Sequence, residues 1–228
     1  MSIDTVIFDM DGVIIDTESV WNSVRHDFAH AHGGHWSDGD QPAVMGASSM
    51  EWATSMRANN GVDLSPQEIY DGIIGGLKER YARHLPVIPG APEAIARLAR
   101  EYRLGVASSS PLELIEYALE LGGLRRHFDS VVSSDDVARG KPEPDVYREA
   151  CLRLRTSPEW AAAVEDSSNG IRAAHAAGLA VVAIPNPEFP PSAQAVGLAD
   201  VVLGSIVELT GVVVASLRQR QAETDHGQ

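Results

Sequence analysis

The sequence has little of three things: cysteine, positive charge and long hydrophobic runs. Cys151 is the only cysteine in 228 residues, so no internal disulfide bond can form, and a reducing compartment is expected. The formal net charge of −14 argues against nucleic acid or an anionic membrane as a partner. No apolar run approaches the roughly 20 residues of a membrane-spanning helix, and no signal-peptide pattern precedes the first predicted strand. These absences predict a cytoplasmic protein.

The length and composition fit one α/β domain with a modest insertion. A chain of 228 residues with 44% hydrophobic residues can bury a substantial core. Short hydrophobic runs predict the strands of a parallel sheet. These runs are residues 6–8, 104–107, 130–132, 161–164, 180–184 and 201–203. Between the first two runs the sequence shows only helical patterns and turns, over a length beyond ordinary loops. We therefore expect a Rossmann-like three-layer α/β core of residues 1–16 and 87–228, with a small all-α cap domain inserted at residues 17–86.

The first predicted strand ends at two carboxylates one residue apart. The hydrophobic run at residues 6–8 is followed by Asp9, Met10, Asp11 and Gly12. Chemistry in α/β folds gathers just beyond the carboxyl ends of parallel strands. Two acids placed together there repel each other unless a cation or a shared proton offsets the repulsion. An acidic turn without function is the alternative, because Asp is common in turns.

Polar residues also follow other predicted strands. Three serines, residues 108–110, follow the second strand, Glu165 and Asp166 follow the fourth, and Lys141 lies on a turn between Gly140 and Pro142. Each has an ordinary structural interpretation: a serine could cap the helix expected at Pro111, the lysine could be a surface residue, and the acids could favour a helix N-terminus. Their common position at one edge of the sheet favours a single site.

Together these residues suit phosphoryl transfer. The four acids are Asp9, Asp11, Glu165 and Asp166. Carboxylates and phosphate oxygens are ligands that Mg²⁺ prefers. Four acids outweigh one Mg²⁺ and one lysine, so a phosphate dianion would be repelled without the metal. Lys141 and the Ser108 hydroxyl can hold phosphate oxygens, and a positioned carboxylate can attack phosphorus to form an acyl phosphate.

These motifs closely resemble those of the haloacid dehalogenase-like hydrolases over nearly the whole chain. The resemblance is carried by residues 8–17 (FDMDGVIIDT), Ser108, residues 140–145 (GKPEPD) and residues 165–167 (EDS). The most similar branch has a small helical cap and contains β-phosphoglucomutase and the sugar-phosphate phosphatases. The resemblance implies a cap that opens and closes over a site between the two domains.

Residue roles follow from the resemblance alone. It implies that Asp9 is the nucleophile and that Asp11 is the general acid and base, with Ser108 and Lys141 completing the catalytic set. The implied Mg²⁺ ligands are Asp9, the backbone carbonyl of Asp11, Glu165 and Asp166. The implied phosphate-binding groups are Ser108, Lys141 and the backbone amides of Gly12 and Ser109.

The choice of reaction depends on a few positions. Asp11 favours phosphate esters, because a departing halide needs no acid. Mutases of this branch typically have His at the place of Trp21 and Arg near Ser49 for a distal phosphate, and this chain departs at both. We therefore expect a phosphatase of small phosphorylated metabolites, with sugar or sugar-alcohol phosphates favoured by the similarity of residues 17–21 and 105–112 to phosphatases of those compounds.

Other interpretations remain open at this point. A β-phosphoglucomutase-type mutase is the enzymatic alternative, and a phospho-accepting receiver domain is the signalling alternative, although receivers have no cap. A phosphosugar-binding protein without turnover would not need Asp11. We expect a monomer. Several cap residues also have open roles: His26, His30, His32 and His35, of which the first two have a spacing that can bind a transition metal. Trp21, Trp36 and Trp52 are expected to pack the cap helices.

Overall fold

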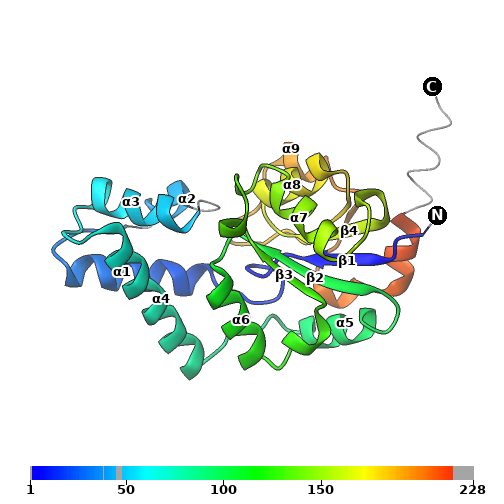
Figure 1. Ribbon diagram of the computed structural model, residues 1–228, viewed down its shortest axis with the longest axis horizontal. Coiled ribbons are helices and arrows are strands. Elements are labelled where there is room, and N and C mark those ends of the chain that lie inside the picture. The colour runs from blue at the N-terminus through cyan, green and yellow to red at the C-terminus, as the bar shows by residue number, and fades with distance from the viewer. Residues whose placement is uncertain (1, 38, 45–47, 218–228) are drawn as a thin grey trace.

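The computed structural model describes residues 2–37, 39–44 and 48–217. Within these residues a six-stranded parallel sheet is covered by helices on both faces, and a separate group of helices stands beyond one end of the sheet (Figure 1). This confirms the predicted α/β fold with a helical cap. The domain limits proposed from the sequence stay a prediction, and residues 1, 38, 45–47 and 218–228 lie outside the described part of the chain.

The sheet has the strand order β3-β2-β1-β4-β5-β6. Its strands are β1 (Thr5–Phe8), β2 (Arg103–Ser108), β3 (Ser130–Ser133), β4 (Ala161–Glu165), β5 (Ala180–Ala183) and β6 (Val201–Val202). All six predicted strands are present, with ends within one residue of the prediction. Phe8, the last residue of β1, is in register with Val106 on β2 and Val164 on β4. The strand order changes direction at β1, and ligand sites in open α/β sheets form at such points.

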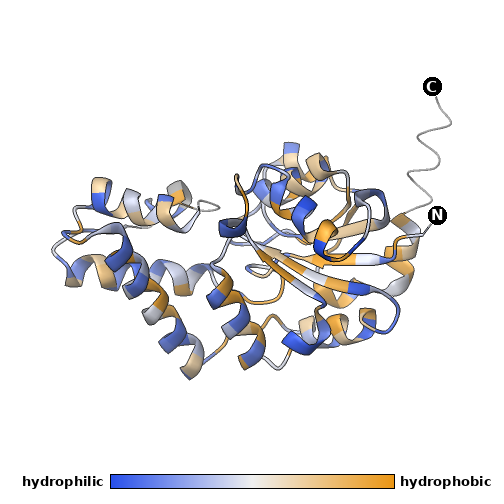
Figure 2. Ribbon diagram, viewed as in Figure 1, coloured by the Kyte–Doolittle hydropathy of each residue, from blue (hydrophilic) through white to orange (hydrophobic). Residues whose placement is uncertain are grey.

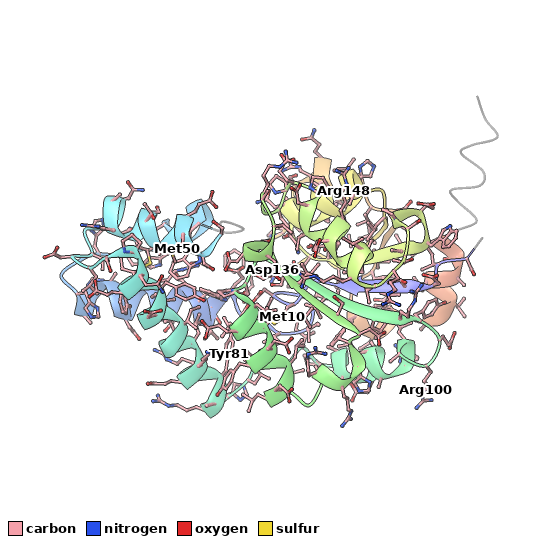
Figure 3. All side chains as sticks on the ribbon, viewed as in Figure 1. Met10, Met50, Tyr81, Arg100, Asp136 and Arg148 are labelled. Carbon is pink, nitrogen blue, oxygen red and sulfur yellow. The ribbon has the colours of Figure 1, made fainter. Side chains whose placement is uncertain are left out.

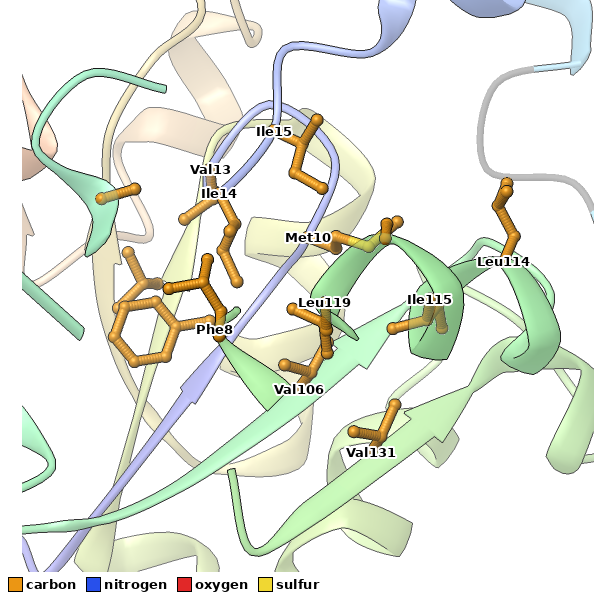
Figure 4. Packing of buried hydrophobic residues seen from close by; sticks show 14 of the residues in the cluster. Phe8, Met10, Val13, Ile14, Ile15, Val106, Leu114, Ile115, Leu119 and Val131 are labelled. Carbon is orange, nitrogen blue, oxygen red and sulfur yellow. The ribbon is translucent and has the colours of Figure 1, made fainter. Parts of the chain in front are cut away.

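Alternation along the strands divides the core into two layers. Phe8 and Val106 point to one face and pack with Met10 and Leu119, as Figure 4 shows, whereas Ile7 belongs to the cluster on the other face. Helices α5 (Ala91–Leu98) and α6 (Leu112–Leu121) cover the first face, and α7 (Asp145–Arg153), α8 (Ser168–Ala177) and α9 (Ala193–Val196) cover the second (Figure 1).

Short helical turns complete the core. These are the 3₁₀ helices η1 (Arg125–His127), η2 (Ser134–Asp136), η3 (Pro158–Trp160) and η4 (Ile206–Glu208), and residues 211–217 are also helical. The strands are mostly hydrophobic, and the outer helices alternate hydrophilic and hydrophobic turns (Figure 2). Among the described residues, no helix is long and apolar enough to cross a membrane.

The cap consists of α1 (Glu18–Ala31), α2 (Gln41–Val44), α3 (Ser49–Asn60) and α4 (Pro66–Arg83). Capping boxes at Ser48 and Ser65 satisfy the first amides of α3 and α4. Trp21, Trp36 and Trp52 are all buried, so the expectation that they pack the cap helices is confirmed.

Two groups of contacts attach the cap to the core. At the start of α3, the backbone amide of Ser49 donates to Asp135 Oδ1 at 3.0 Å, and the Ser49 hydroxyl donates to the other oxygen of the same carboxylate. On α4, the Tyr70 hydroxyl donates to Glu113 Oε1 of α6 at 2.9 Å, and Lys78 forms an ion pair with the same carboxylate. The anionic carboxylate of Asp135 suits the N-terminus of α3, where free amides and the helix dipole favour negative charge.

Glycine allows α1 and α4 to pack closely. A Cβ added at Gly72 would lie 2.1 Å from a ring carbon of Phe28, and one at Gly76 would lie 3.0 Å from a methyl carbon of Val24. The close contact between α1 and α4 therefore depends on glycine, which has no side chain, at these two positions of α4.

We predict that Gly72→Ala and Gly75→Ala have opposite effects on stability. Alanine is better than glycine by about 1 kcal/mol inside a helix, and at the exposed Gly75 no described atom beyond the adjacent turns of α4 lies within 4 Å of the new Cβ. At Gly72 the new Cβ must displace Phe28, and overpacking of this kind costs about 1–3 kcal/mol. Chemical denaturation of the two variants measures the difference. Equal stabilisation at both positions would contradict the packing of α1 against α4.

Candidate active site

Three buried carboxylates meet where two neighbouring strands end. Asp9 follows β1, Glu165 ends β4 and Asp166 follows it, and one oxygen of each lies within 4.8 Å of the others. The backbone amide of Asp9 donates to the carbonyl of Val164 at 2.9 Å, which continues the strand pairing up to the site. The sheet register therefore places these acids together, as the sequence predicted.

Lys141 is the cation that this cluster surrounds. Its Nζ donates to Glu165 Oε1 at 2.6 Å and to the carbonyl oxygen of Ala107 at 3.0 Å, and it lies 3.0 Å from Asp9 Oδ1. The lysine is 6% exposed, so the interpretation of it as an ordinary surface residue is wrong. Its pKa is raised by Asp9 and Glu165, although burial alone would lower it.

Tyr147 contacts both members of the ion pair between Lys141 and Glu165. Its hydroxyl donates to Glu165 Oε1 at 2.6 Å, and its ring centre lies 5.1 Å from Nζ of Lys141. Gly170 closes in from α8, where an added Cβ would fall 1.9 Å from the Glu165 carboxylate. Ser167 donates to Glu165 Oε2 at 3.3 Å. Both oxygens of Glu165 thus already accept hydrogen bonds.

The cluster is short of positive charge. Burial raises the pKa of Asp9 to about 8, and the repulsion of Glu165 and Asp11 adds to this against the opposing effect of Lys141. Burial, followed by repulsion from Asp9 and Glu165, also raises the pKa of Asp166 well above its ordinary value. A divalent cation would favour the ionised form of each group.

The residues fit a hard metal ion. Asp9 Oδ1 is buried and has no aligned hydrogen bond among the described residues, despite its ion pair with Lys141. Gly12, at φ +79°, leaves room for the Asp166 carboxylate, because a Cβ at Gly12 would lie 2.0 Å from Asp166 Oδ2. Asp9 and Asp166 also line an open cavity. Carboxylate oxygens with room for water are what Mg²⁺ requires. Glu165 belongs to the cluster, but its role as a ligand stays a prediction.

Asp11 stands apart from the acidic cluster and is held by hydroxyl groups. Its Oδ1 accepts a hydrogen bond from Thr17 at 2.6 Å, and its Oδ2 accepts from Ser108 at 3.0 Å and from Ser110 at 2.8 Å. The suggestion that one of these serines caps the next helix is wrong, because α6 begins after Pro111 without a side-chain cap. The hydroxyls of Ser108 and Ser110 donate to the Asp11 carboxylate instead.

A cavity of about 470 Å³ lies above these groups. Asp9, Asp11, Lys141, Asp166 and Ser109 line it from the core. Ser108 and Gly12, which the family resemblance places at the phosphate, are not among the residues that line this cavity. Ser108 is fully buried, with its hydroxyl directed to Asp11. Their roles in phosphate binding therefore stay predictions.

Sequence reasoning did not assign several residues around this site. Glu18 lines the cavity from the start of α1, and Glu188 and Phe189 line it from the loop after β5. Glu18 lies within the motif that resembles sugar phosphatases, which was the available signal. Tyr147 carried none, since its position in α7 fits an ordinary core residue.

The histidine pair of the cap stays separate from this chemistry. His26 and His30 are exposed, and their ring centres lie 4.4 Å apart. Among the residues that the structure describes, the only group of three or more candidate metal ligands is Asp9, Glu165 and Asp166. The suggestion of a transition-metal site in the cap gains no third ligand.

Comparison with known proteins identifies the family. The family model described as haloacid dehalogenase-like hydrolase matches residues 6–184. The chain belongs to the haloacid dehalogenase-like hydrolases. The prediction of a hydrolase is thereby confirmed, and the receiver-domain alternative is excluded. Membership also accounts for the parallel sheet and for the helical cap beside its central strand.

Similar proteins of this family act on or bind phosphorylated carbohydrates. Hexitol phosphatase B of Escherichia coli (strain K12) is 34% identical over 217 residues, which are 90% of this chain and 93% of that protein. The phosphorylated carbohydrates phosphatase of Thermotoga maritima is 29% identical over 77% of this chain and 82% of its own. A mutant of CbbY from Rhodobacter sphaeroides, solved with xylulose-(1,5)bisphosphate, has a TM-score of 0.82 at 28% identity and covers 93% of this chain and 99% of its own.

We predict that Mg²⁺ stabilises the folded protein through Asp9 and Asp166. A ligand at 100 times its dissociation constant adds about 2.7 kcal/mol to the free energy of unfolding. Thermal unfolding with increasing Mg²⁺ should show a rising midpoint. Asp166→Asn removes one repelling charge, so this variant should be no less stable without metal and should lose most of the Mg²⁺ effect. Asp63→Asn, at an exposed position of the cap, is the control and should respond like the wild type.

Proposed function

We propose that this protein is a Mg²⁺-dependent phosphatase of small sugar or sugar-alcohol monophosphates, acting through an aspartyl-phosphate intermediate. The observation that carries the proposal is that Asp9, Asp11 and Lys141 line the same cavity, which Glu18 of the cap also lines. The family membership and the carbohydrate phosphatases among the relatives support it. The bound magnesium ion would supply the positive charge that lets a phosphate approach these acids.

Asp9 is the proposed nucleophile. Its carboxylate is held beside Lys141 Nζ at 3.0 Å, and its backbone is fixed by the strand pairing with Val164. A carboxylate fixed in this way meets the phosphorus of a bound ester without a search over rotamers. Attack forms the bond between the carboxylate oxygen and phosphorus as the bond to the leaving alcohol oxygen breaks, and water then cleaves the aspartyl phosphate.

Asp11 is the proposed general acid and base. The three hydroxyls of Thr17, Ser108 and Ser110 fix its carboxyl group at the cavity wall. A hydroxyl both donates and accepts hydrogen bonds, so the same three groups can accommodate Asp11 with or without its proton. The residue can therefore give a proton to the departing alcohol and later take one from the attacking water without a change of position.

The other side chains that line the cavity favour an uncharged alcohol as the leaving group. They include Glu18 from the cap and Glu188 with Phe189 from the core. Carboxylates accept hydrogen bonds from hydroxyls, and an aromatic side chain packs against carbon-bound hydrogens. Among the described lining residues Lys141 is the only lysine or arginine, and it is already paired with Asp9 and Glu165. A second phosphate would therefore meet negative charge, which disfavours both a bisphosphate substrate and the mutase alternative.

We predict that Asp9→Asn lowers turnover of p-nitrophenyl phosphate by at least about 10³-fold, because an amide cannot replace the carboxylate as nucleophile. Chelation of Mg²⁺ by EDTA should abolish the wild-type activity, and added Mg²⁺ should restore it. Steady-state kinetics measure both effects, with circular dichroism to confirm that the variant is folded. Near wild-type turnover of Asp9→Asn would refute the assigned nucleophile, and full activity in EDTA would refute the role of the metal.

We further predict that hydrolysis exceeds phosphoryl transfer between sugar hydroxyls. With β-glucose 1-phosphate and a glucose bisphosphate primer, the release of inorganic phosphate should be faster than the formation of glucose 6-phosphate, because the described residues that line the cavity include no unpaired lysine or arginine for the second phosphate. Coupled assays for the two products make the comparison. Efficient interconversion with little phosphate release would instead establish the mutase.

A further inference from the structure

A buried arginine lies at the centre of the cap. Arg25, on α1, is 5% exposed, and its guanidinium carbon lies 4.5 Å from the ring centre of Trp21, 5.4 Å from that of Trp52 and 5.7 Å from that of Trp36. Such rings attract a cation through their negative faces. A buried charge is costly unless it is paired, and no carboxylate among the described residues lies within ion-pair distance of Arg25.

Arg25 instead reaches a carboxylate through one amide. Its Nη1 donates to Gln41 Oε1 at 2.8 Å, and Gln41 Nε2 donates to Glu18 Oε2 at 2.8 Å. Arginine only donates and a carboxylate only accepts, so the amide of Gln41 has one possible orientation. Gln41 is itself 3% exposed. We call these three residues the cap relay.

The cap relay ends at the catalytic cavity. Glu18 lines this cavity together with Asp9 and Asp11. Burial raises the pKa of Glu18 and the charge of Asp11 adds to the rise, whereas the hydrogen bond from Gln41 and, to a smaller extent, the charge of Arg25 oppose it. The hydrogen bond from Gln41 therefore opposes the effect of burial and holds the Glu18 carboxylate at a fixed position in the cavity lining.

A second buried polar group of the cap has no hydrogen-bond partner among the described residues. The Tyr81 hydroxyl on α4 (Figure 3) forms no hydrogen bond with any described residue, although the side chain is only 1% exposed. Burial raises the pKa of this hydroxyl, and the charges of Asp11 and Glu18 add to the rise. Buried hydroxyls are normally paired, so the Tyr81 hydroxyl is a polar group of the cap that the described residues leave unused.

We propose that Arg25 is a positioning residue that acts through Gln41 to hold Glu18 as a receptor for hydroxyl groups of the leaving alcohol. The relay selects phosphate monoesters whose alcohol carries several hydroxyls and no charge, such as hexitol phosphates. This inference rests on the proposed phosphatase activity and adds a determinant of its specificity. Arg25 itself does not contact the substrate, because Gln41 stands between it and Glu18.

Comparison of two substrates tests the relay. Sorbitol 6-phosphate offers hydroxyls to Glu18, whereas p-nitrophenyl phosphate offers none. Arg25→Met should lower kcat/KM for sorbitol 6-phosphate by about 10–100-fold, the range expected for loss of a hydrogen bond to a charged group. The same variant should hydrolyse p-nitrophenyl phosphate within about twofold of wild type. Arg83→Met, at an exposed arginine of the same cap, is the matched control and should change neither value.

Further variants separate positioning from folding. Gln41→Met breaks the relay while leaving Arg25 in place, and should reproduce the selective loss. Glu18→Gln should do the same, and its combination with Arg25→Met should add little, because both changes disable one unit. If Arg25 only fills the cap, thermal unfolding should shift and both substrates should lose activity equally. That result, or an unchanged preference for sorbitol 6-phosphate in Arg25→Met and Gln41→Met, would overturn the proposal.

Binding without turnover distinguishes this inference from the proposed function. In the Asp9→Asn background, calorimetric titration with sorbitol 6-phosphate and Mg²⁺ should show weaker binding by about 10-fold or more when Arg25→Met is added. Failure of the wild type to hydrolyse either substrate would refute the phosphatase assignment. Equal sorbitol 6-phosphate affinities with and without Arg25→Met would refute the relay, whatever the outcome for hydrolysis.

Discussion

Repulsion among buried carboxylates is the constraint on which the site depends. Hydrogen bonding between adjacent parallel strands brings Asp9 beside Glu165 and Asp166, and Lys141 forms ion pairs with Asp9 and Glu165. One lysine cannot balance three acids in a buried position, and the raised pKa of Asp9 expresses this deficit. The protein keeps such an arrangement because the rest of the sheet holds the strands together. The deficit is what a divalent ion at this cluster would offset.

The core and the cap each bury one cation, but they stabilise it differently. In the core, Lys141 makes direct ion pairs, and Tyr147 and Gly170 hold Glu165 against it. In the cap, Arg25 lies among tryptophan rings and reaches a carboxylate only through an amide. The first arrangement places charge where phosphate is expected. The second keeps its charge out of the cavity and presents a carboxylate there, so the two halves of the cavity differ in what they can bind.

The sequence predicted the fold and the acidic cluster because both depend on local patterns. Hydrophobic runs marked six strands, and the ends of those strands marked Asp9, Glu165 and Asp166 without knowledge of any contact. The serines near Pro111 were harder to interpret, because their hydroxyls could bond either to the first amides of α6 or to a carboxylate. Only the position of Asp11 decides between the two. Arg25 gave no signal at all, because its tryptophan neighbours come from three separate cap segments.

The acidic walls of the cavity come from different parts of the protein, and this has a consequence for the reaction cycle. Glu18 belongs to the cap and Glu188 to the core loop after β5. An alcohol long enough to contact both Glu18 and Glu188 would bridge the cap and the core. Inorganic phosphate has no alcohol group and would contact only the core residues that bind phosphate. Contacts with the substrate would therefore favour closure of the cap over the core, and inorganic phosphate, which lacks the contact with Glu18, would not oppose its opening.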